Sequence, residues 1–550
     1  MTYMLPRIGH QTKMIPFTSR QSNRLPLWLL SSIAFHMTCL FVAPNSDGQT
    51  IELKHLTVAQ FQSSFDKHVN LGLLPRDIQV TVKKNVPLYD VIFEKPNDKF
   101  RWAAHHHMSD VHFSTNLAKY DKQKLVLRIH RKYSVAGKQF HVGYWAQKPI
   151  SSKKIWQTDV TIPQSGKAVS QLKPFDDLMV SFLKSNQIPG ATIAITRSGR
   201  LVYSRGFGVS EIAPKQSIST GSRMRIASLS KPITAVAILR LVELGKLSLD
   251  DRVFELLDHL PYAANGKIDL RLKEITVIHC LQHTAGWDRN KSYDPMFRPT
   301  QIANALSVDC PPGPDHIIRF MLNQPLDHHP GTQYAYSNFG YSVLGRVIEK
   351  ITGQRYETFV QENILEPIGI SQMQIGKTLA SQRADQEVRY YARGNSKRRS
   401  IAGGPDEWVD IPYGAWHVES MDAHGGWIAT AEDMVRFAAA FDKPEDSPIL
   451  TRESIQKMFA RPKKPIGLDN KGMPSPFFYG CGWLVRPAGN SQNTWHNGLL
   501  EGTSTLLVRR HDGLNWAVLF NKSHCLDGKT AAGKIDALLH QAAKEVKNWP

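Results

Sequence analysis

The clearest apolar pattern lies in the stretch from Arg223 to Gly245, RMRIASLSKPITAVAILRLVELG. After Pro232, apolar residues recur at helical spacing, at Ala235, Val236, Ile238, Leu239, Val242 and Leu244. Pro232 fits the first turn of a helix, because its missing N–H would have no partner there. Gly245 is typical of a residue that ends a helix. The pattern therefore predicts one long helix between Pro232 and Gly245.

Alternating apolar and polar positions, which are typical of strands, flank a mostly helical stretch from about 225 to 445. Before it, a helix at Phe175–Leu183 precedes a hairpin at 189–209. After it come three predicted strands and an amphipathic helix, at Gly482–Arg486, Thr503–Arg510, Asn515–Asn521 and Thr530–Lys547. We therefore predict an α+β fold, in which an antiparallel sheet formed from both ends of the domain carries a large helical insert. The natural cleft of this fold is the seam between sheet and helices.

Residues 52–150 contain two copies of a repeat of about fifty residues. LTVAQFQSSFDK at 56–67 aligns with MSDVHFSTNLAK at 108–119, and YDVIFEKP at 89–96 parallels FHVGYWAQKP at 140–149. Each copy suggests a short helix, a strand such as Leu125–Arg131 and an aromatic strand such as Val142–Trp145. We expect a small N-terminal α+β repeat domain, a linker at 151–172 and a second domain at 173–547.

Three consecutive histidines, His105, His106 and His107, begin the second copy and raise the question of a metal site. Three consecutive side chains diverge in a regular backbone, so one ion is not easily bound by all three. We expect a surface at the repeat boundary, with a metal site as the alternative. No other motif indicates a metal or cofactor, and Cys280, Cys310, Cys481 and Cys525 match no metal or redox spacing.

The net charge of +20 over 550 residues favours polyanionic partners, which include nucleic acid, acidic membranes and acidic cell-wall polymers. No nucleic-acid-binding motif accompanies the charge. We therefore expect no nucleic-acid partner, and we expect the basic repeats to bind an anionic polymer of the cell envelope.

Residues 1–46 have the pattern of a targeting segment. Arg7, Lys13, Arg20 and Arg24 precede an apolar run at 25–43, after which polar sequence begins. We interpret the segment as a signal peptide, with an uncleaved anchor through residues 25–43 as the alternative. Either interpretation predicts export, to the periplasm or to the extracellular space.

Ser228 and Lys231 stand three residues apart, so both project from one face of a helix. A serine hydroxyl becomes a nucleophile when a neighbouring base takes its proton, and a buried, neutral lysine is such a base. The helix N-terminus adds N–H groups that stabilise an oxyanion. The same spacing occurs at five other places, including Ser64–Lys67 and Ser454–Lys457, so the pair alone is a weak signal.

Two further segments fall at the predicted seam. Tyr336–Ser337–Asn338 precedes a helix, where a phenol and an amide can share one cleft; a helix cap beside a buried aromatic is the plainer interpretation. His496–Asn497–Gly498 begins an edge strand. There Gly498 would let substrate approach closely, and the Leu499 N–H would supply half of an oxyanion hole. The absence of Gly-x-Ser-x-Gly from the sequence argues against an α/β-hydrolase.

Taken in order, SLSK at 228–231, YSN at 336–338 and HNG at 496–498 closely resemble the motifs of the serine β-lactamase-like superfamily. That superfamily includes class C β-lactamases, D-alanyl-D-alanine peptidases and related esterases. The flanking blocks MRIASLSKPITA, ITVIHCLQHTAGW, PGTQYAYSNFGY and HGGWIATAEDMVRFA extend the resemblance over about 173–545. The N-terminal copies resemble bacterial tandem repeats, also described as polyglycine-hydrolase-like repeats.

The resemblance implies a β-lactamase/transpeptidase-like fold and a role for each motif residue. Ser228 would be the acylated nucleophile, Lys231 its base, Tyr336 the partner base and Asn338 the amide that positions Lys231. The N–H groups of Ser228 and Leu499 would form the oxyanion hole, with Asn497 and Gly498 beside the substrate. His496 stands where β-lactamases and peptidases usually carry lysine, although several esterase-like members carry histidine.

The histidine puts recognition of a substrate carboxylate in doubt, because an unperturbed imidazole is mostly neutral at pH 7. We therefore expect turnover of uncharged esters over penicillins. We also expect better handling of carboxylate substrates below about pH 6.5, where His496 would be protonated.

The leading hypothesis is an exported serine hydrolase that cleaves an ester, amide or peptide through an acyl-enzyme. A β-lactamase or D-alanyl-D-alanine carboxypeptidase proper is the alternative within this class. A catalytically silent envelope-binding protein is the alternative from another class, and the intact set of motif residues argues against it.

Overall fold

The computed structural model describes residues 50–95, 101–123, 125–147, 155–156, 160–260, 268–393, 397–402, 407–463, 466, 468 and 473–550. The chain divides into two compact units, Met1–Lys153 and Lys154–Pro550, and each is described by itself. The expected targeting segment at 1–46 lies outside the described residues. Among the described helices, none combines the length and apolar character that a membrane span requires.

The two repeats of the first unit share one topology of strand, helix, strand and strand. The first copy consists of β1 (Thr50–Leu56), α1 (Val58–Asn70), β2 (Leu74–Lys83) and β3 (Val86–Glu94), and the second of β4 (Trp102–Met108), α2 (Asp110–Lys122), β5 (Val126–Val135) and β6 (Lys138–Ala146). Their sheets have the orders β1-β3-β2 and β4-β6-β5. The apolar pattern had not revealed β1 and β4, the strands that precede each helix.

The two copies pack against each other through one aromatic core. Phe61 and Phe93 of the first copy join Trp102 and Tyr144 of the second in a single buried cluster. The hydroxyls of Tyr89 and Tyr133, one from each copy, lie 2.6 Å apart in a buried hydrogen bond. The copies therefore form one body rather than two independent modules.

The three consecutive histidines lie within β4, and their rings hydrogen-bond three different partners. His105 is buried and contacts the Tyr120 hydroxyl at 2.6 Å, while His106 contacts Gln62 at 2.6 Å. His107 contacts the Tyr133 hydroxyl at 2.9 Å. The expectation of a surface position is wrong for His105, because alternation along the strand turns it into the core.

The second unit is built on an antiparallel sheet to which both ends of the unit contribute. Its strands run in the order β10-β9-β8-β20-β19-β18-β17-β16, with β7 (Gln164–Ser165) beside β9. Their bounds are β8 Gly190–Arg197, β9 Arg200–Glu211, β10 Gln216–Ser217, β16 Phe478–Tyr479, β17 Leu484–Ala488, β18 Ser491–Leu500, β19 Thr503–Arg509 and β20 Leu514–Phe520. β8 and β20 pair from Ala191↔Phe520 to Arg197↔Leu514. The predicted α+β fold with a sheet formed from both ends is confirmed.

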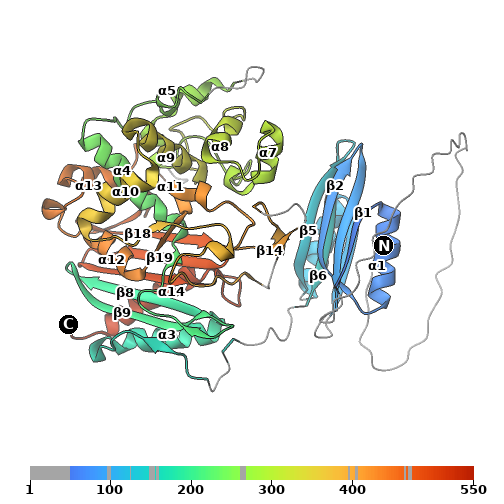
Figure 1. Ribbon diagram of the computed structural model, residues 1–550, viewed down its shortest axis with the longest axis horizontal. Coiled ribbons are helices and arrows are strands. Elements are labelled where there is room, and N and C mark those ends of the chain that lie inside the picture. Colours follow the sequence, from blue (N-terminus) through green and yellow to red (C-terminus); the bar gives the residue numbers. More distant parts are fainter. Residues whose placement is uncertain are drawn as a thin grey trace, which may run out of the picture. The chain divides into compact units, whose positions relative to one another are not determined.

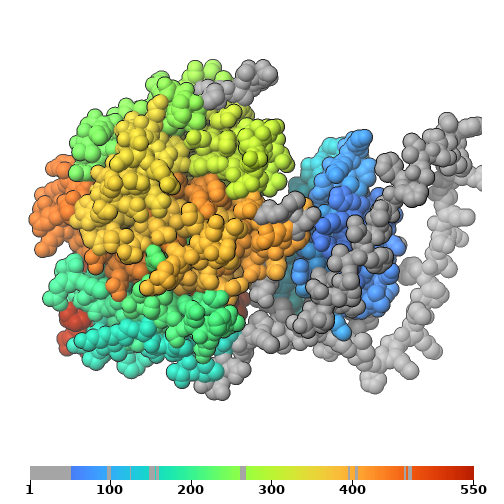
Figure 2. Space-filling model, in the orientation of Figure 1, coloured from blue at the N-terminus to red at the C-terminus, as the bar shows by residue number. Residues whose placement is uncertain are grey.

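Each face of this sheet carries its own helical layer, because alternate residues of each strand point to opposite faces. On β19, Leu506 and Val508 belong to the core with α3 (Lys173–Asn186) and α14 (Ala531–Glu545). Leu507 belongs instead to the core of the helical insert. Figure 1 shows α3 on one side of the sheet and α4 (Ser230–Glu243) and α9 (Asn338–Thr352) on the other. In the space-filling view, the insert, coloured green to orange, covers one side of this unit (Figure 2).

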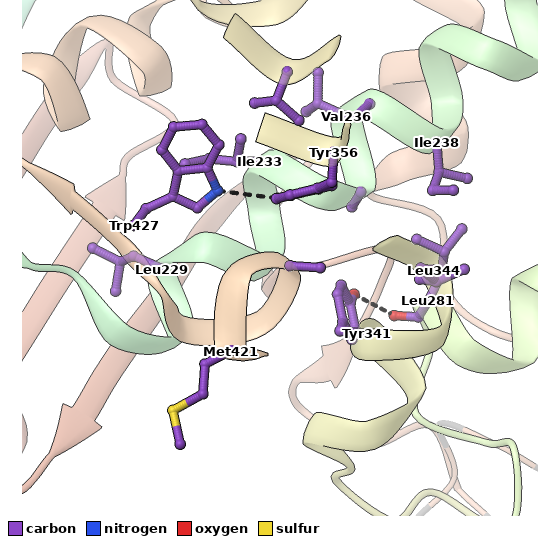
Figure 3. Close-up of a cluster of buried hydrophobic side chains, with 14 of the residues drawn as sticks. Leu229, Ile233, Val236, Ile238, Leu281, Tyr341, Leu344, Tyr356, Met421 and Trp427 are labelled. Carbon is purple, nitrogen blue, oxygen red and sulfur yellow. Dashed lines mark hydrogen bonds between the residues drawn. The ribbon is translucent and has the colours of Figure 1, made fainter. Parts of the chain in front are cut away.

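The long helix predicted from Pro232 is α4, which begins two residues earlier, directly after the short 3-10 helix η2 (Ala227–Leu229). The helix is buried on nearly all sides, as its predominantly apolar sequence requires. Figure 3 shows Ile233 and Val236 among aromatic side chains, where the Trp427 indole donates a hydrogen bond to the Tyr356 hydroxyl at 3.0 Å. The start of α4 is therefore anchored in the core of the insert.

Candidate active site

Ser228 lies on η2, in a backbone segment that is tied to strands on both sides. β11 (Met224–Arg225) pairs with β15 (Trp427–Ala429), and the Ile226 N–H donates to the Trp427 carbonyl at 2.9 Å. On the other side, the hydroxyl of Thr505 on β19 donates to the Ile226 carbonyl at 2.8 Å. Ala227 has a φ of 50°, a left-handed conformation that alanine rarely adopts and that surrounding contacts must enforce. The half-buried Ser228 is thus held in a fixed and strained turn.

Gly498 allows this turn to lie directly against β18. A Cβ at position 498 would overlap the Ile226 carbonyl oxygen and the Thr505 hydroxyl. The sequence suggested that this glycine makes room for substrate. In the structure it makes room for the chain's own backbone, which brings Ser228 next to the strand.

Lys231 is fully buried, and its ammonium nitrogen has three acceptors. The Nζ atom lies 3.2 Å from Ser228 Oγ, 2.7 Å from Asn338 Oδ1 and 2.9 Å from the His424 carbonyl. Burial holds the pKa of Lys231 well below its usual value; the Arg289 charge acts in the same direction and Asp294 opposes it. The lowered pKa favours the neutral amine of Lys231, which can accept a proton from Ser228.

Asn338 is fixed at both ends of its amide. Its oxygen accepts from Lys231, and its Nδ2 donates to Asp294 Oδ2 at 2.6 Å. The hydroxyl of Ser337 caps α9 by accepting the Gly340 N–H at 3.3 Å, so the plainer interpretation of this motif holds together with the functional one. Sequence reasoning missed Asp294, which lies in a loop without any recognisable motif.

Tyr336 is half-buried, and its ring centroid lies 4.8 Å from Lys231 Nζ and 4.6 Å from the guanidinium carbon of Arg289. Burial raises the pKa of Tyr336, while the nearby Ser228 hydroxyl and the Arg289 charge lower it. At neutral pH the site therefore pairs a protonated phenol with a lysine of low proton affinity.

His496 faces the same site from β18, with both ring nitrogens engaged by its own strand layer. Nδ1 lies 2.8 Å from the Asn497 carbonyl, which can only accept, so Nδ1 carries the proton. Nε2 then accepts from the Tyr479 hydroxyl at 2.9 Å. Burial, and next the Lys231 charge, lower the pKa of His496 to about 3. The expectation that His496 becomes a cation below about pH 6.5 is therefore wrong, because its burial was not foreseen.

The second half of β18 forms an edge, although its first half does not. β17 pairs with β18 only as far as Trp495, whereas β19 pairs with it through Leu500. Among the described strands, residues 496–500 have no partner on the β17 side. η2 packs against β18, where Gly498 faces the Ile226 carbonyl and Ala227. The oxyanion hole of the Ser228 and Leu499 N–H groups stays a prediction. The Asn497 side chain is exposed on the face opposite His496, so the structure does not bring it to Ser228.

An aromatic cluster, made of Tyr334, Tyr336, Tyr479 and His283, adjoins these residues. The His283 ring centroid lies 4.3 Å from that of Tyr336 and 4.4 Å from that of Tyr479, and its Nδ1 accepts the Ser337 N–H at 3.2 Å. A cavity of about 220 Å³ opens beside Tyr334 and Tyr479 and is lined by Pro476, Phe477, Phe478 and Leu484 among others. Tyr336 was predicted from its motif, whereas sequence reasoning missed the other three residues; the only signals were the family-like blocks at 275–287 and 330–341, which contain His283 and Tyr334.

Comparison with protein families gives two matches. The model described as Beta-lactamase matches residues 175–540, and the model described as "Polyglycine hydrolase-like, structural repeat" matches residues 55–96. The first match covers the unit that holds the site, and the second covers the first repeat copy.

Individual relatives match the same part of the chain. Penicillin-binding protein 4* of Bacillus subtilis (strain 168) is 26% identical over 62% of this chain and 69% of its own length. Protein flp of Staphylococcus aureus (strain COL) is 23% identical over 60% of this chain and 59% of its own length. Among solved structures, the D-amino acid amidase from Ochrobactrum anthropi SV3 has a TM-score of 0.52 at 19% identity, covering 69% of this chain and 99% of its own. At that identity the likeness concerns the fold.

Proposed function

The chain belongs to the beta-lactamase family of serine hydrolases, and on this premise we propose that it cleaves an ester, amide or peptide bond through an acyl-enzyme on Ser228. The family predicted from the three motifs is thereby confirmed, as is the polyglycine-hydrolase-like repeat. The observation that carries the proposal is the contact of 3.2 Å between Ser228 Oγ and the buried Lys231 Nζ.

In the acylation step, Lys231 takes the proton of Ser228 as Oγ attacks the substrate carbonyl. The carbonyl oxygen, now negative, accepts hydrogen bonds from the N–H groups of Ser228 and Leu499. Tyr336 gives its proton to the leaving group and regains one from Lys231, so charge does not accumulate on either base. Asn338, held by Asp294, keeps Lys231 directed at Ser228 throughout.

In the deacylation step, water replaces the leaving group. Tyr336 passes its own proton to the neutral Lys231, which lies beside its ring, and accepts a proton from that water as the water attacks the acyl carbonyl; Lys231 then returns a proton to Ser228 Oγ. The carbonyl–Oγ bond then breaks, Ser228 recovers its proton, and the acid product leaves. The same pair of bases therefore serves both steps in opposite directions.

Export and binding to the cell envelope complete the proposal. Export rests on the targeting pattern of residues 1–46, and binding of an anionic envelope polymer rests on the net charge of +20. Fractionation of the producing cells tests the first. Co-sedimentation of the full chain, and of a chain that lacks residues 1–153, with an acidic cell-wall polymer tests the second, since only the full chain should sediment.

A fluorophosphonate probe tests the chemistry directly. We expect covalent labelling of the full chain and its complete loss in Ser228→Ala. Ser230→Ala is the matched control: the Ser230 hydroxyl donates to the Ala227 carbonyl at 2.8 Å inside the core, so its loss costs about 1 kcal/mol of stability and leaves labelling intact. Absence of labelling in the folded wild type would support the silent envelope-binding alternative.

A further inference from the structure

The charges that face Ser228 are distributed in an unexpected way. The neutral His496 offers no cation on β18, and Lys231 is buried with its three acceptors already in place. Arg289 is exposed, and its guanidinium carbon lies 4.6 Å from the ring centroid of Tyr336. Burial is the main cause of the shifted pKa values of Lys231 and Tyr336, and the Arg289 charge lowers both. The positive potential at the mouth of the site therefore comes from Arg289.

The carboxylates near Arg289 are engaged by other groups. Asp294 accepts from Asn338 at 2.6 Å and from the Met296 N–H at 3.1 Å. Asp288 accepts the Asn290 N–H at 2.9 Å and faces His328 Nε2 at 3.3 Å. Within the described residues, Arg289 forms no ion pair within 4.0 Å, and its recorded contact is the face of Tyr336.

A guanidinium that stacks on an aromatic face keeps its in-plane N–H donors for another partner. Those donors match the two oxygens of a carboxylate better than any other common group. Arg289 lies over the same Tyr336 ring as Lys231 Nζ, which is 3.2 Å from Ser228 Oγ, so a ligand held by Arg289 lies close to the carbonyl that Ser228 would attack.

We propose that Arg289 binds a carboxylate of the substrate, so that the preferred substrate is an anionic ester or amide recognised on the Tyr336 side of Ser228 rather than on β18. The inference rests on the proposed hydrolase function and names its substrate class. It replaces the expectation, drawn from His496 alone, that uncharged esters are preferred.

Two matched substrate pairs test the proposal with the full chain. The first is mono-para-nitrophenyl glutarate against para-nitrophenyl valerate, which places the carboxylate on the acyl side. The second is an acylated lactate against its carboxamide, which places it on the leaving side. In at least one pair, wild type should prefer the anionic member. Arg289→Gln should lower kcat/KM for that member by about 10- to 100-fold more than for its neutral twin, whose own loss reports the effect of the Arg289 charge on Lys231 and Tyr336. Arg289→Lys should retain part of the preference.

Arg298→Gln is the matched control, because Arg298 is also exposed and lies 6.0 Å from a tyrosine ring, that of Tyr293. Arg298→Gln should leave kcat/KM unchanged for both members of each pair. Lack of an anionic preference in both pairs, or equal losses for both members in Arg289→Gln, would overturn the proposal; equal losses would mean that Arg289 acts only through Tyr336. Because the neutral twin is still hydrolysed in those cases, they leave the hydrolase function standing. Failure of wild type to hydrolyse any member would instead overturn the function itself.

Discussion

The two walls of the cleft at Ser228 are built in opposite ways. On the insert side, Lys231, Tyr336 and Asn338 come from α4 and the turn into α9, and their polar atoms meet one another and Ser228. On the sheet side, both ring nitrogens of His496 form hydrogen bonds within the sheet, to Tyr479 and to the Asn497 carbonyl. Gly498 has no side chain, so only its backbone faces the turn that holds Ser228. The difference teaches that proton transfer and positioning are separated: one wall can exchange protons with Ser228, and the other holds the turn in place.

The largest effects should come from the insert wall. Lys231→Ala and Tyr336→Phe should each lower turnover by about 10²-fold or more, because each removes a base. The double variant should lose much less than the product of the single losses, since both act on one proton. Steady-state kinetics on a para-nitrophenyl ester measures both.

Tyr334→Phe is the control for the loss of a hydroxyl in the same aromatic cluster. Its ring remains 6.0 Å from that of Tyr479 and no Ser228 contact is lost, so turnover should stay within about threefold of wild type. Fully multiplicative losses in the double variant would show that Lys231 and Tyr336 do not share a path.

The next effect should come from the sheet wall, through geometry. Gly498→Ala must push η2 away from β18, which should cost about 1–3 kcal/mol of unfolding free energy and lower kcat/KM by about 10- to 100-fold. Denaturant unfolding measures the change in unfolding free energy, and ester hydrolysis measures the change in kcat/KM. Gly340→Ala adds the same methyl with no neighbour closer than 3.7 Å, and in a helix it should stabilise slightly. Equal behaviour of the two variants would contradict the positioning role of this wall.

Replacement of His496 should have a smaller effect on kcat/KM and should leave the pH dependence of activity unchanged. Lys231 is the base, so activity should fall as the pH drops through its lowered pKa and Lys231 becomes protonated. His496 has a pKa of about 3 and stays neutral at physiological pH. His496→Gln should therefore lower kcat/KM by only about 3- to 10-fold, through the lost Tyr479 hydrogen bond, and leave the acidic limb in place. Disappearance of a limb near pH 6.5 would show that the histidine titrates.

The smallest effect should come from the repeats. A chain that begins at Lys154 contains the complete second unit and should hydrolyse small esters within about twofold of the full chain. A chain that begins at residue 173, the boundary expected from the sequence, would lack Trp156 and Ile162, which belong to the core of the second unit. A folded Lys154 chain without activity would mean that the repeats take part in the chemistry.

Much of the fold could be predicted because its signals are local. The apolar spacing after Pro232 reports a helix buried on nearly all sides, and the alternation along β19 and β20 reports two packed faces. The strand β4 escaped notice because, with its three histidines, it does not alternate simply between apolar and polar residues. β1 does alternate at Ile51–Lys54, and its pattern was overlooked.

The site was only partly predictable, for a physical reason. The motif residues could be named from their spacing, but the groups that fix them come from distant loops and strands. Asp294 reaches Asn338 only when the insert has folded, and Tyr479 reaches His496 only when the strands of the sheet have paired. The protonation state of His496 likewise depends on burial, which no local pattern encodes.

The pairing of β8 with β20 has a consequence for the order in which the unit can assemble. β20 lies between β8 and β19 in the sheet, although the whole insert separates β20 from β8 along the chain. Until β20 emerges, the hairpin of β8 and β9 has an unpaired edge, and pairings over such a sequence distance form slowly. A nascent chain therefore keeps this edge open while the insert is being synthesised, and a chain that stops before β20 exposes two strand edges that invite aggregation.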